Sequence, residues 1–451
     1  MQALLKRWPL LLVAVLAVGM LLLVACKKED KDEVKTTPGA TAKVTAKATA
    51  GEWPGNTNGV TPTEIKIGAL LPMSQTAAAT WGTAISAGMK AYFEYIHANG
   101  GIYGRKINLI IGDSQYTGPV AIEAARKLVE QDKVFALQGG LGTEAMNATY
   151  KYVEEKGVPD MWLLAAEDRF TEPVSRNRFT WLVEYLDEGR LLGQYIGENF
   201  DGKKLGILAQ NDDFGKKGEE GVKLGIEDKG ASLVSVTEYY ESTQTDVTAQ
   251  TQRLKNANGD VIAVYGMPQQ AASLIKTARE TLSWDVPFVI TGVDAVEIEG
   301  ALAGYKNIEG AISVVYGHQA YEAEQAGIAA FRANLEKYGG GAKPNNLNLT
   351  GYVIAQATTH LLIQTGPDLT RDAFLTTAES LCKWEGPVSI APASLSPTDH
   401  RFTQVERYVK ATGADADFRW EFIGENMSFE STKDCTVPTP HPEATSQPPI
   451  P

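Results

Sequence analysis

Short runs of β-branched and other apolar residues alternate with longer amphipathic stretches along most of this 451-residue chain. Strands that are apolar throughout are typical of a parallel sheet covered by helices on both faces. A break in the rhythm near residue 200 separates two sets of runs, so we predict an α/β fold of two doubly wound parallel-sheet lobes. The runs are 65–71, 107–111, 134–137 and 161–164, then 205–208, 233–236, 261–265, 288–290 and 311–315.

The stretches between these runs have helical periodicity. Ile85, Met89, Tyr92, Phe93 and Ile96 recur at the spacing of one helix face, and we interpret this stripe as core rather than as a ligand box. Further short strands are expected at 405–410 and 418–422. The length predicts two or three domains.

The overall charge is acidic, with a formal net value of −13. Removal of an N-terminal leader that carries Lys6 and Arg7 would change −13 to −15. A net negative charge of this size argues against nucleic acid or an anionic membrane surface as a partner.

The N-terminus carries an export signal. Lys6 and Arg7 precede the apolar run 10–25, which is short for a membrane span and ends in small residues before Cys26. The segment Leu23-Val-Ala-Cys26 resembles the bacterial lipobox, so we expect residues 1–25 to be a lipoprotein signal peptide and Cys26 to be the lipid attachment site. The protein would then lie at the extracytoplasmic face of the cell membrane. A signal anchor, or an ordinary signal beside an incidental cysteine, is the alternative.

Both ends of the remaining chain are poor in large apolar residues. We expect 26–61 to be a disordered tether and 431–451 to be a C-terminal tail, disordered after Cys435. Cys382 and Cys435 are an even pair in an oxidising compartment, which predicts a disulfide that closes the C-terminal segment. A metal site is the competing use of two cysteines, but neither has the spacing of a zinc ligand.

No catalytic motif is found among the serine-hydrolase, metalloprotease and P-loop patterns, so we predict no catalytic residues, no metal and no cofactor. The stretch 140–145 (GLGTEA) fits the dinucleotide fingerprint, and Glu167 could serve as the acidic ribose partner. The alternative is a strand-to-helix turn whose N-H groups and Thr143 hydroxyl hold an anionic group.

Several landmarks in order resemble branched-chain amino-acid binding proteins of ABC transporters. Residues 59–68 (GVTPTEIKIG) and 99–107 (NGGIYGRKI) resemble the entry strand and the loop before the second strand. Residues 212–215 (DDFG) and 396–401 (SPTDHR) match two later landmarks. The resemblance covers roughly residues 59–430.

This resemblance implies the type I periplasmic-binding fold, with three crossovers between two lobes and ligand in the cleft between them. Binding beyond the carboxyl ends of parallel strands is also what strand topology predicts. The implied lobes are 62–183 plus 316–384 and 184–315 plus 385–430.

The resemblance also implies a ligand-binding set. Trp81 and Phe214 would be the aromatic side chains that cover the ligand, and Asp294 would pair with an ammonium group. Thr143 and the backbone at Ala165 and Ala166 would hold a carboxylate. An aromatic residue of the second lobe is expected between 265 and 269.

Glu167 departs from the family pattern, which has a serine or threonine at this point. A carboxylate beside an anionic ligand group would cost on the order of 1 kcal/mol or more. If Glu167 faces the cleft, a cationic, amide or polyhydroxyl solute is favoured over a plain amino acid. If the loop is shifted by one residue, the side chain faces solvent.

The expected function is that of a lipid-anchored, non-enzymatic solute-binding protein, a monomer that closes its lobes on a small polar solute. The solute would be an amino acid, an amide or a related compound, delivered to an ABC permease and its ATPase subunits. A ligand-sensing receptor with the same fold but no transport role is the alternative.

Overall fold

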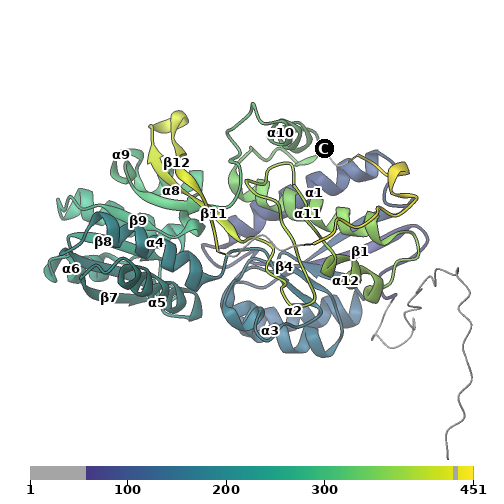
Figure 1. Ribbon diagram of the computed structural model, residues 1–451, viewed down its shortest axis with the longest axis horizontal. Helices are drawn as coiled ribbons and strands as arrows, with labels where there is room; N and C mark the ends of the chain where they lie inside the picture. The colour runs from purple at the N-terminus through teal and green to yellow at the C-terminus, as the bar shows by residue number, and fades with distance from the viewer. Residues whose placement is uncertain (1–56, 430–434, 450–451) are drawn as a thin grey trace, which may run out of the picture. The chain divides into compact units, whose positions relative to one another are not determined.

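Two separate β-sheets form the framework of the protein in the computed structural model, which describes residues 57–429 and 435–449 (Figure 1). The predicted signal peptide, Cys26 and most of the predicted tether lie outside the described residues. Each sheet belongs to one lobe, so the predicted α/β fold with two parallel-sheet lobes is confirmed.

The first lobe contains a five-stranded sheet in the order β2-β1-β3-β4-β5, and every pairing in it is parallel. The register places Glu64 opposite Lys106 and Leu71 opposite Asp113. Its strands are β1 (Glu64–Leu71), β2 (Lys106–Asp113), β3 (Ala136–Gln138), β4 (Asp160–Leu163) and β5 (Arg178–Thr180).

The second lobe contains a seven-stranded sheet in the order β12-β11-β10-β9-β8-β6-β7. The pairings from β7 to β10 are parallel, whereas β11 and β12 add an antiparallel edge. The strands are β6 (Lys204–Gln210), β7 (Val234–Tyr240), β8 (Val261–Tyr265), β9 (Phe288–Ile290), β10 (Ile312–Val315), β11 (Val405–Thr412) and β12 (Arg419–Ser428).

Helices cover both faces of each sheet. The first lobe has α1 (Ala79–Ala98), α2 (Gly118–Arg126), α3 (Thr143–Glu155), α10 (Ala326–Tyr338), α11 (Asn346–Thr365) and α12 (Arg371–Glu379). The second has α4 (Tyr185–Asn199), α5 (Asp213–Asp228), α6 (Thr248–Asn256), α7 (Pro268–Lys276), α8 (Glu297–Ala303) and α9 (Tyr305–Ile308). Across the described ranges, none of the helices combines the length and apolar character that a membrane crossing requires.

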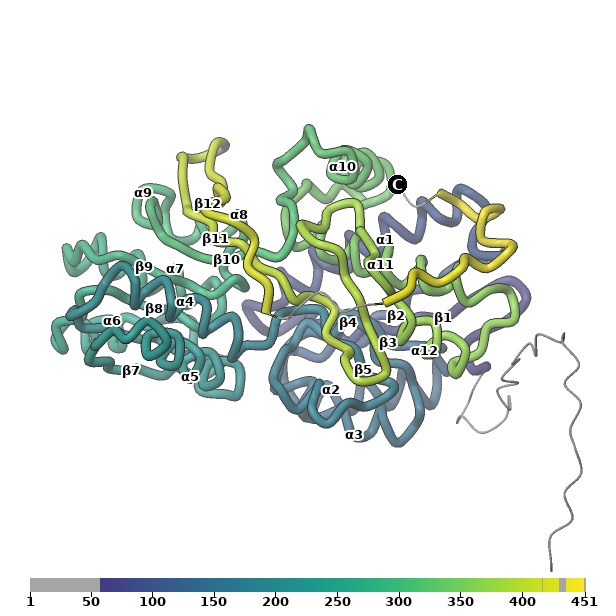
Figure 2. The backbone as a smooth tube through the Cα atoms, viewed as in Figure 1, coloured from purple at the N-terminus to yellow at the C-terminus, as the bar shows by residue number. Residues whose placement is uncertain are grey.

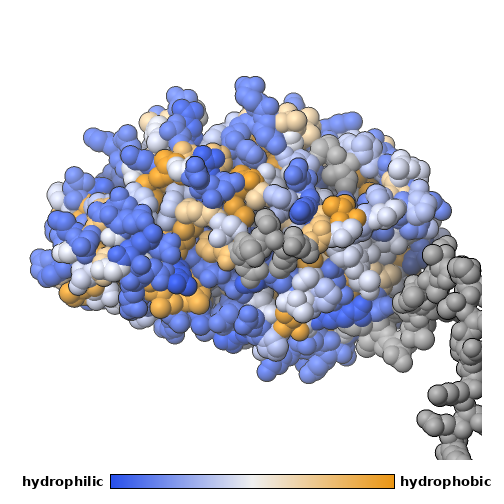
Figure 3. Space-filling view, viewed as in Figure 1, coloured by the Kyte–Doolittle hydropathy of each residue, from blue (hydrophilic) through white to orange (hydrophobic). Residues whose placement is uncertain are grey.

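The apolar core divides into four clusters, because each sheet buries both of its faces. In β1, Ile67 and Ala69 face the cluster that contains α1 and α11, while Leu70 faces the cluster of α2 and α3. In β6, Ile207 packs with α4 and α5, and Leu208 packs with α6 and α7. The face drawn in Figure 3 is accordingly a mosaic of hydrophilic and hydrophobic residues rather than one apolar surface.

One strand was not predicted from the sequence. β5 has only three residues, Arg178, Phe179 and Thr180, and it lacks the apolar run by which the other strands were recognised. It forms because the edge of β4 is free to pair with it, and because the segment before β11 covers its other side.

Three crossovers connect the lobes: residues 181–184 lead into α4, 316–325 into α10 and 380–404 into β11. The third differs from the boundary expected at 384/385, because most of it packs on the first lobe. Val388, Leu395 and Phe402 belong to the core cluster of α1 and α11, and the second lobe resumes only at β11.

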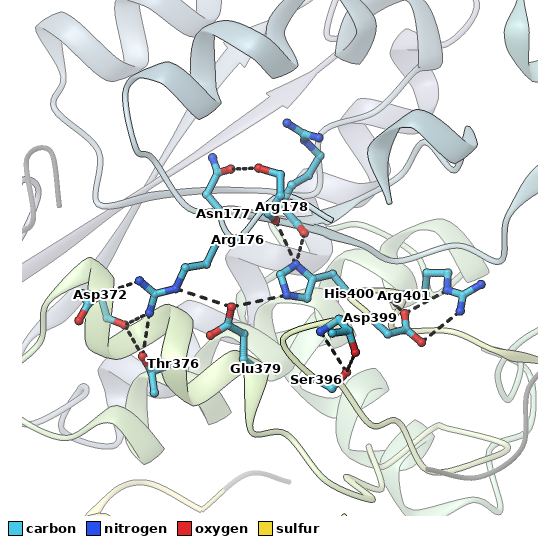
Figure 4. A network of polar contacts seen from close by, with 12 residues as sticks. Arg176, Asn177, Arg178, Asp372, Thr376, Glu379, Ser396, Asp399, His400 and Arg401 are labelled. Carbon is cyan, nitrogen blue, oxygen red and sulfur yellow. Dashed lines mark hydrogen bonds and ion pairs between the residues drawn. The ribbon is translucent and has the colours of Figure 1, made fainter. Parts of the chain in front are cut away.

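Polar contacts hold the third crossover against β5 (Figure 4). The backbone N-H groups of Thr180 and Phe402 donate to the carbonyls of His400 and Thr180, at 3.1 Å each. The His400 ring stacks on Phe179, and its Nδ1 lies 2.8 Å from the Arg178 carbonyl oxygen. Asp399 pairs with Arg401, whose guanidinium also reaches Glu184 in the first crossover. The 396–401 motif therefore fixes two crossovers to one sheet edge.

The C-terminal tail was predicted to be disordered from its composition, but residues 435–449 lie along the first lobe (Figure 2). The Gln447 side chain accepts a hydrogen bond from the Tyr103 N-H at 2.6 Å, and the Tyr95 hydroxyl donates to the Pro449 carbonyl at 3.1 Å. Composition missed this because proline-rich segments can dock through their carbonyls and rings without forming a core of their own.

The predicted disulfide between Cys382 and Cys435 is present, with 5.8 Å between the Cα atoms. It ties the start of the tail to the third crossover. Because the bond closes a loop of 53 residues, its loss should lower the stability of the native state relative to the unfolded chain.

We therefore expect the double substitution Cys382→Ala/Cys435→Ala to lower the free energy of unfolding by about 2–4 kcal/mol, measured by urea denaturation. The unsubstituted protein in dithiothreitol is the matched control and should reach the same value. Equal stability of the oxidised protein and the double variant would contradict a stabilising role for this bond.

Candidate ligand-binding site

A cavity of about 220 Å³ lies between the loops at the carboxyl ends of the two sheets. Both lobes and all three crossovers contribute to its walls, which places it where parallel-sheet topology puts ligands. Of the residues predicted from the sequence, Trp81 and Phe214 line this cavity.

The walls are largely apolar. The first lobe contributes mainly side chains of α1, α11 and the loops after β3 and β4, and the second lobe contributes the loops after β8 and β9. These wall residues are Trp81, Ile85, Leu141, Leu164, Leu347, Leu349 and Val353 on one side and Met267, Val293 and Val296 on the other. A lining of this kind favours a ligand that presents apolar surface.

Aromatic rings from two crossovers form another part of the wall. Trp181 and Phe402 stack with ring centres 4.5 Å apart and planes 14° from parallel. Trp162 lies behind them, 4.8 Å from Phe402, and its indole N-H donates to the Thr358 hydroxyl at 2.9 Å. Because Trp162 is anchored in the first lobe, the stack ties the crossover wall to that lobe.

Tyrosine side chains cover Thr143, the residue expected to bind a ligand carboxylate. Thr143 begins α3, as predicted for a strand-to-helix turn, but its hydroxyl lies 3.0 Å from the Tyr185 hydroxyl. Tyr116 lies over the same turn: a Cβ atom on Gly142 would come within 2.6 Å of its ring, so the φ of +103° and the close approach both require glycine. Thr143 itself does not line the cavity, whereas Tyr116 and Tyr185 do.

Ala165 and Ala166 also lie behind the cavity wall. Both are fully buried, and the Ala166 carbonyl accepts a hydrogen bond from the Tyr185 N-H at 3.1 Å. Neither residue is among those that line the cavity. The backbone site expected for a ligand carboxylate is therefore used in part to position Tyr185.

Phe214 reaches the cavity from the first turn of α5. Its ring lies 4.8 Å from that of Tyr185 and 5.1 Å from that of Tyr265. Asp212 caps the helix by accepting from the Gly215 N-H at 3.2 Å, which fixes where the helix begins. The aromatic residue expected between 265 and 269 is absent from the wall, and Met267 lines the cavity there.

Glu167 occupies neither of the two positions considered from the sequence. Its side chain is 3% exposed, does not line the cavity, and forms an ion pair with Arg169. Burial raises the pKa of Glu167 to about 7, the neighbouring Asp168 adds to the rise, and Arg169 opposes it. The residue belongs to a charged cluster at the rim between α3 and α5.

Asp294 is buried behind the second-lobe wall. Its neighbours Val293 and Ala295 line the cavity, but Asp294 does not. Neither of its carboxyl oxygens has a hydrogen-bond partner among the described residues. Burial, followed by the nearby Glu188, raises its pKa well above the usual range.

Glu188 and Glu406 are acidic residues of the cavity wall that the sequence analysis did not single out. Glu188 Oε1 accepts hydrogen bonds from the Thr291 hydroxyl at 2.5 Å and the Gly292 N-H at 3.1 Å. Burial raises the pKa of both carboxyls, and Glu188 raises that of Glu406 further. With Asp294 and Glu299 they form a row of buried carboxyls in the second lobe, with no lysine or arginine paired to them among the described residues.

Some wall residues that were not predicted from the sequence could have been identified from their positions after predicted strands. Tyr116 and Met267 lie in the loops after the predicted strands 107–111 and 261–265, where parallel topology places ligand contacts. Trp181 and Phe402 could not be identified from the sequence, because they lie on crossovers whose meeting point depends on how the two lobes pack. Glu406 lies at the start of β11, beside the third crossover, and its place in the wall depends on the same packing.

Comparison with known proteins agrees with this architecture. Residues 64–415 match a family model described as a periplasmic binding protein. The Leu/Ile/Val-binding protein homolog 7 of Brucella abortus (strain 2308) is 24% identical over 307 residues, with 65% of this chain and 75% of the relative covered. The family and this relative are solute-binding proteins, not enzymes.

Solved structures share the fold. A possible leucine/isoleucine/valine-binding protein from Rhodopirellula baltica SH 1 has a TM-score of 0.73 and 17% identity, covering 80% of this chain and 97% of that one. A fatty acid ABC transporter substrate-binding protein from Thermomonospora curvata has a TM-score of 0.73 and 21% identity, covering 84% and 96%. At these identities the likeness establishes the fold alone.

The buried carboxyls predict an unusual pH dependence of stability. Burial raises the pKa of Asp160 to about 6 and that of Glu167 to about 7, and it raises the pKa values of Asp294 and Glu299 well above their usual range. Each of these groups binds its proton more tightly in the folded state than in the unfolded state. Its contribution to the free energy of unfolding is therefore complete below about pH 4 and is lost as the pH rises through the pKa of the folded state.

We expect the melting temperature at constant ionic strength to rise as the pH falls from 8 to 5. Glu299→Gln should flatten this rise, because a neutral amide needs no proton to be buried. A melting temperature that stays level or falls over that interval would contradict the assignment of raised pKa values.

Proposed function

Because the chain belongs to the periplasmic binding protein family, we propose that it captures a small solute outside the cytoplasm and delivers it to the permease of an ABC importer. The observation that carries this proposal is the cavity at the carboxyl ends of both sheets, walled by both lobes and by all three crossovers. A ligand in this position would contact both lobes at once, so its binding energy would favour the closed arrangement.

The apolar character of the walls bears on the kind of solute. The sequence predicts a small polar solute such as an amino acid or an amide. Thr143, Ala165, Ala166 and Asp294, which would hold the charged groups of an amino acid, lie behind the wall rather than in it. We therefore propose a solute whose larger part is apolar, covered by Trp81, Phe214 and the crossover rings.

The cellular setting extends the proposal. Residues 1–25 would direct export, Cys26 would carry the lipid that holds the protein at the membrane, and the mature protein would act as a monomer with the permease and its ATPase subunits. The acidic surface makes the lipid the main attachment, since a net charge of −13 is repelled by anionic headgroups.

A thermal-shift screen of the purified protein tests solute capture directly. Amino acids, amides, polyamines, aromatic acids, aromatic amines and fatty acids form the panel. A true solute at a hundredfold excess over its dissociation constant should stabilise the fold by about 3 kcal/mol, visible as a higher melting temperature. Tryptophan fluorescence should change with it, because Trp81 and Trp181 line the cavity. A panel that yields no shift would remove the main support for this function.

Charged contacts join the lobes at the rim of the cavity. Asp213, in the first turn of α5, accepts from the Asn147 amide and pairs with Arg169, at 3.0 Å in each case. Lys217, one turn later, lies 3.1 Å from Asp168. These groups are partly exposed, so each contact is worth well under 1 kcal/mol by itself, but together they favour closure.

We expect Asp213→Ala/Lys217→Ala to shift the lobes toward a more open arrangement, seen as a larger radius of gyration by small-angle X-ray scattering. Asp228→Ala is the matched control, since its ion pair with Arg190 joins α4 and α5 within the second lobe. An unchanged radius for the double variant, or an equal increase for the control, would argue against a closing role for the rim cluster.

A further inference from the structure

We propose that the solute is an apolar amine: an aromatic or branched aliphatic body of about one ring, with a cationic or strongly donating nitrogen recognised by Glu188 and Glu406. This inference rests on the proposed solute-binding function and adds the chemical class of the solute.

The size and lining of the cavity indicate the size and polarity of the larger part of the ligand. An apolar cavity of roughly 150 Å³ holds a benzene ring, and this one measures about 220 Å³. The space therefore suits a ring with a short side chain. Stacked rings at Trp181 and Phe402, with Trp81 and Phe214 from the two lobes, offer aromatic faces that attract both apolar groups and cations.

Glu188 and Glu406 set the polar end. Both line the cavity and both are buried, with Glu406 only 1% exposed. Glu188 comes from the first turns of α4 and is held by Thr291 and Gly292, while Glu406 comes from β11. The two carboxyl groups interact with each other through a side-chain hydrogen bond, and Tyr265 also contacts Glu188. Glu406 Oε2 accepts no hydrogen bond from an N-H or O-H donor of the described residues, although a buried carboxyl oxygen normally accepts one.

A nitrogen cation would meet the needs of this pair. Two buried carboxyls without a basic partner repel each other when ionised and must share or take up protons. An ammonium group in the cavity beside this pair would supply the missing positive charge and a donor for Glu406 Oε2. No anionic ligand could do so, because its own carboxylate would add a third negative charge.

The wall offers little positive charge to pair with a ligand carboxylate. Among the lining residues of the described chain, Lys383 is the one lysine or arginine, and its side chain is exposed. His318 also lines the cavity but lies 2.9 Å from Glu322. Because Tyr185 covers Thr143, an α-amino acid would bury its carboxylate with weak compensation.

The positions of Glu188 and Glu406 in the chain also connect ligand recognition with closure of the lobes. Glu188 lies in the first turn of α4, which follows the first crossover, and Glu406 lies near the start of β11, which follows the third. A nitrogen held by both would join the two chain segments that must move when the lobes close. The apolar part of the same ligand would contact Trp81 in the opposite lobe.

Isothermal titration with four matched probes tests this class: 2-phenylethylamine, 2-phenylethanol, 3-phenylpropanoate and L-phenylalanine. They share the ring and differ in the charge of the side chain. We expect the amine to bind most tightly. Glu188→Gln and Glu406→Gln should each weaken amine binding by roughly tenfold or more, with a smaller effect on the alcohol. Glu299→Gln is the matched control, because Glu299 is buried nearby but does not line the cavity, and it should leave amine binding unchanged.

The outcomes separate this inference from the function on which it rests. Tighter binding of the acid or the amino acid than of the amine would overturn the amine assignment and leave solute capture intact. The amine assignment would also fail if the two glutamine variants bound the amine as tightly as the unsubstituted protein does. It would fail likewise if none of the four probes bound but another member of the thermal-shift panel did. If neither these probes nor that panel bind, both proposals fail. Circular dichroism of each variant shows whether loss of binding reflects loss of fold.

Discussion

The meeting of three crossovers at one cavity wall is the constraint on which the rest of the structure depends. The two sheets have separate cores, and three crossovers connect them beside the cavity. The 396–401 motif holds the third crossover on β5 through His400, and Arg401 reaches Glu184 in the first. The wall that faces a ligand is thus built in part from the segments that connect the lobes.

Burial of each sheet on both faces explains where polar groups can be presented. Side chains within the parallel strands pack mainly into the four core clusters, so most contacts with a ligand come from loops, crossovers and helices. The turn before α3 shows how such a loop can be adapted. Gly142 makes room for Tyr116, Tyr185 occupies the Thr143 hydroxyl, and a site suited to an anion becomes part of an apolar wall.

The row of buried carboxyls in the second lobe is energetically costly. Glu188, Glu406, Asp294 and Glu299 lose their water without gaining a basic partner among the described residues. Glu188 and Glu406 border the cavity, whereas Asp294 and Glu299 do not line it. A charge arrangement of this kind lowers stability at neutral pH, and a cationic ligand at the bordering pair would recover part of that loss.

The sequence by itself determined the α/β class, the order of all strands except β5, the two lobes and the disulfide partners. It could do so because apolar periodicity and cysteine parity are local properties of the chain. Local motifs also found Trp81 and Phe214 in the cavity wall. Only the tertiary structure decided which side chains share that wall. Asp294 and Glu167 turned away from it, while Trp181, Phe402 and Glu406 entered it, because these positions depend on contacts between segments far apart in the chain.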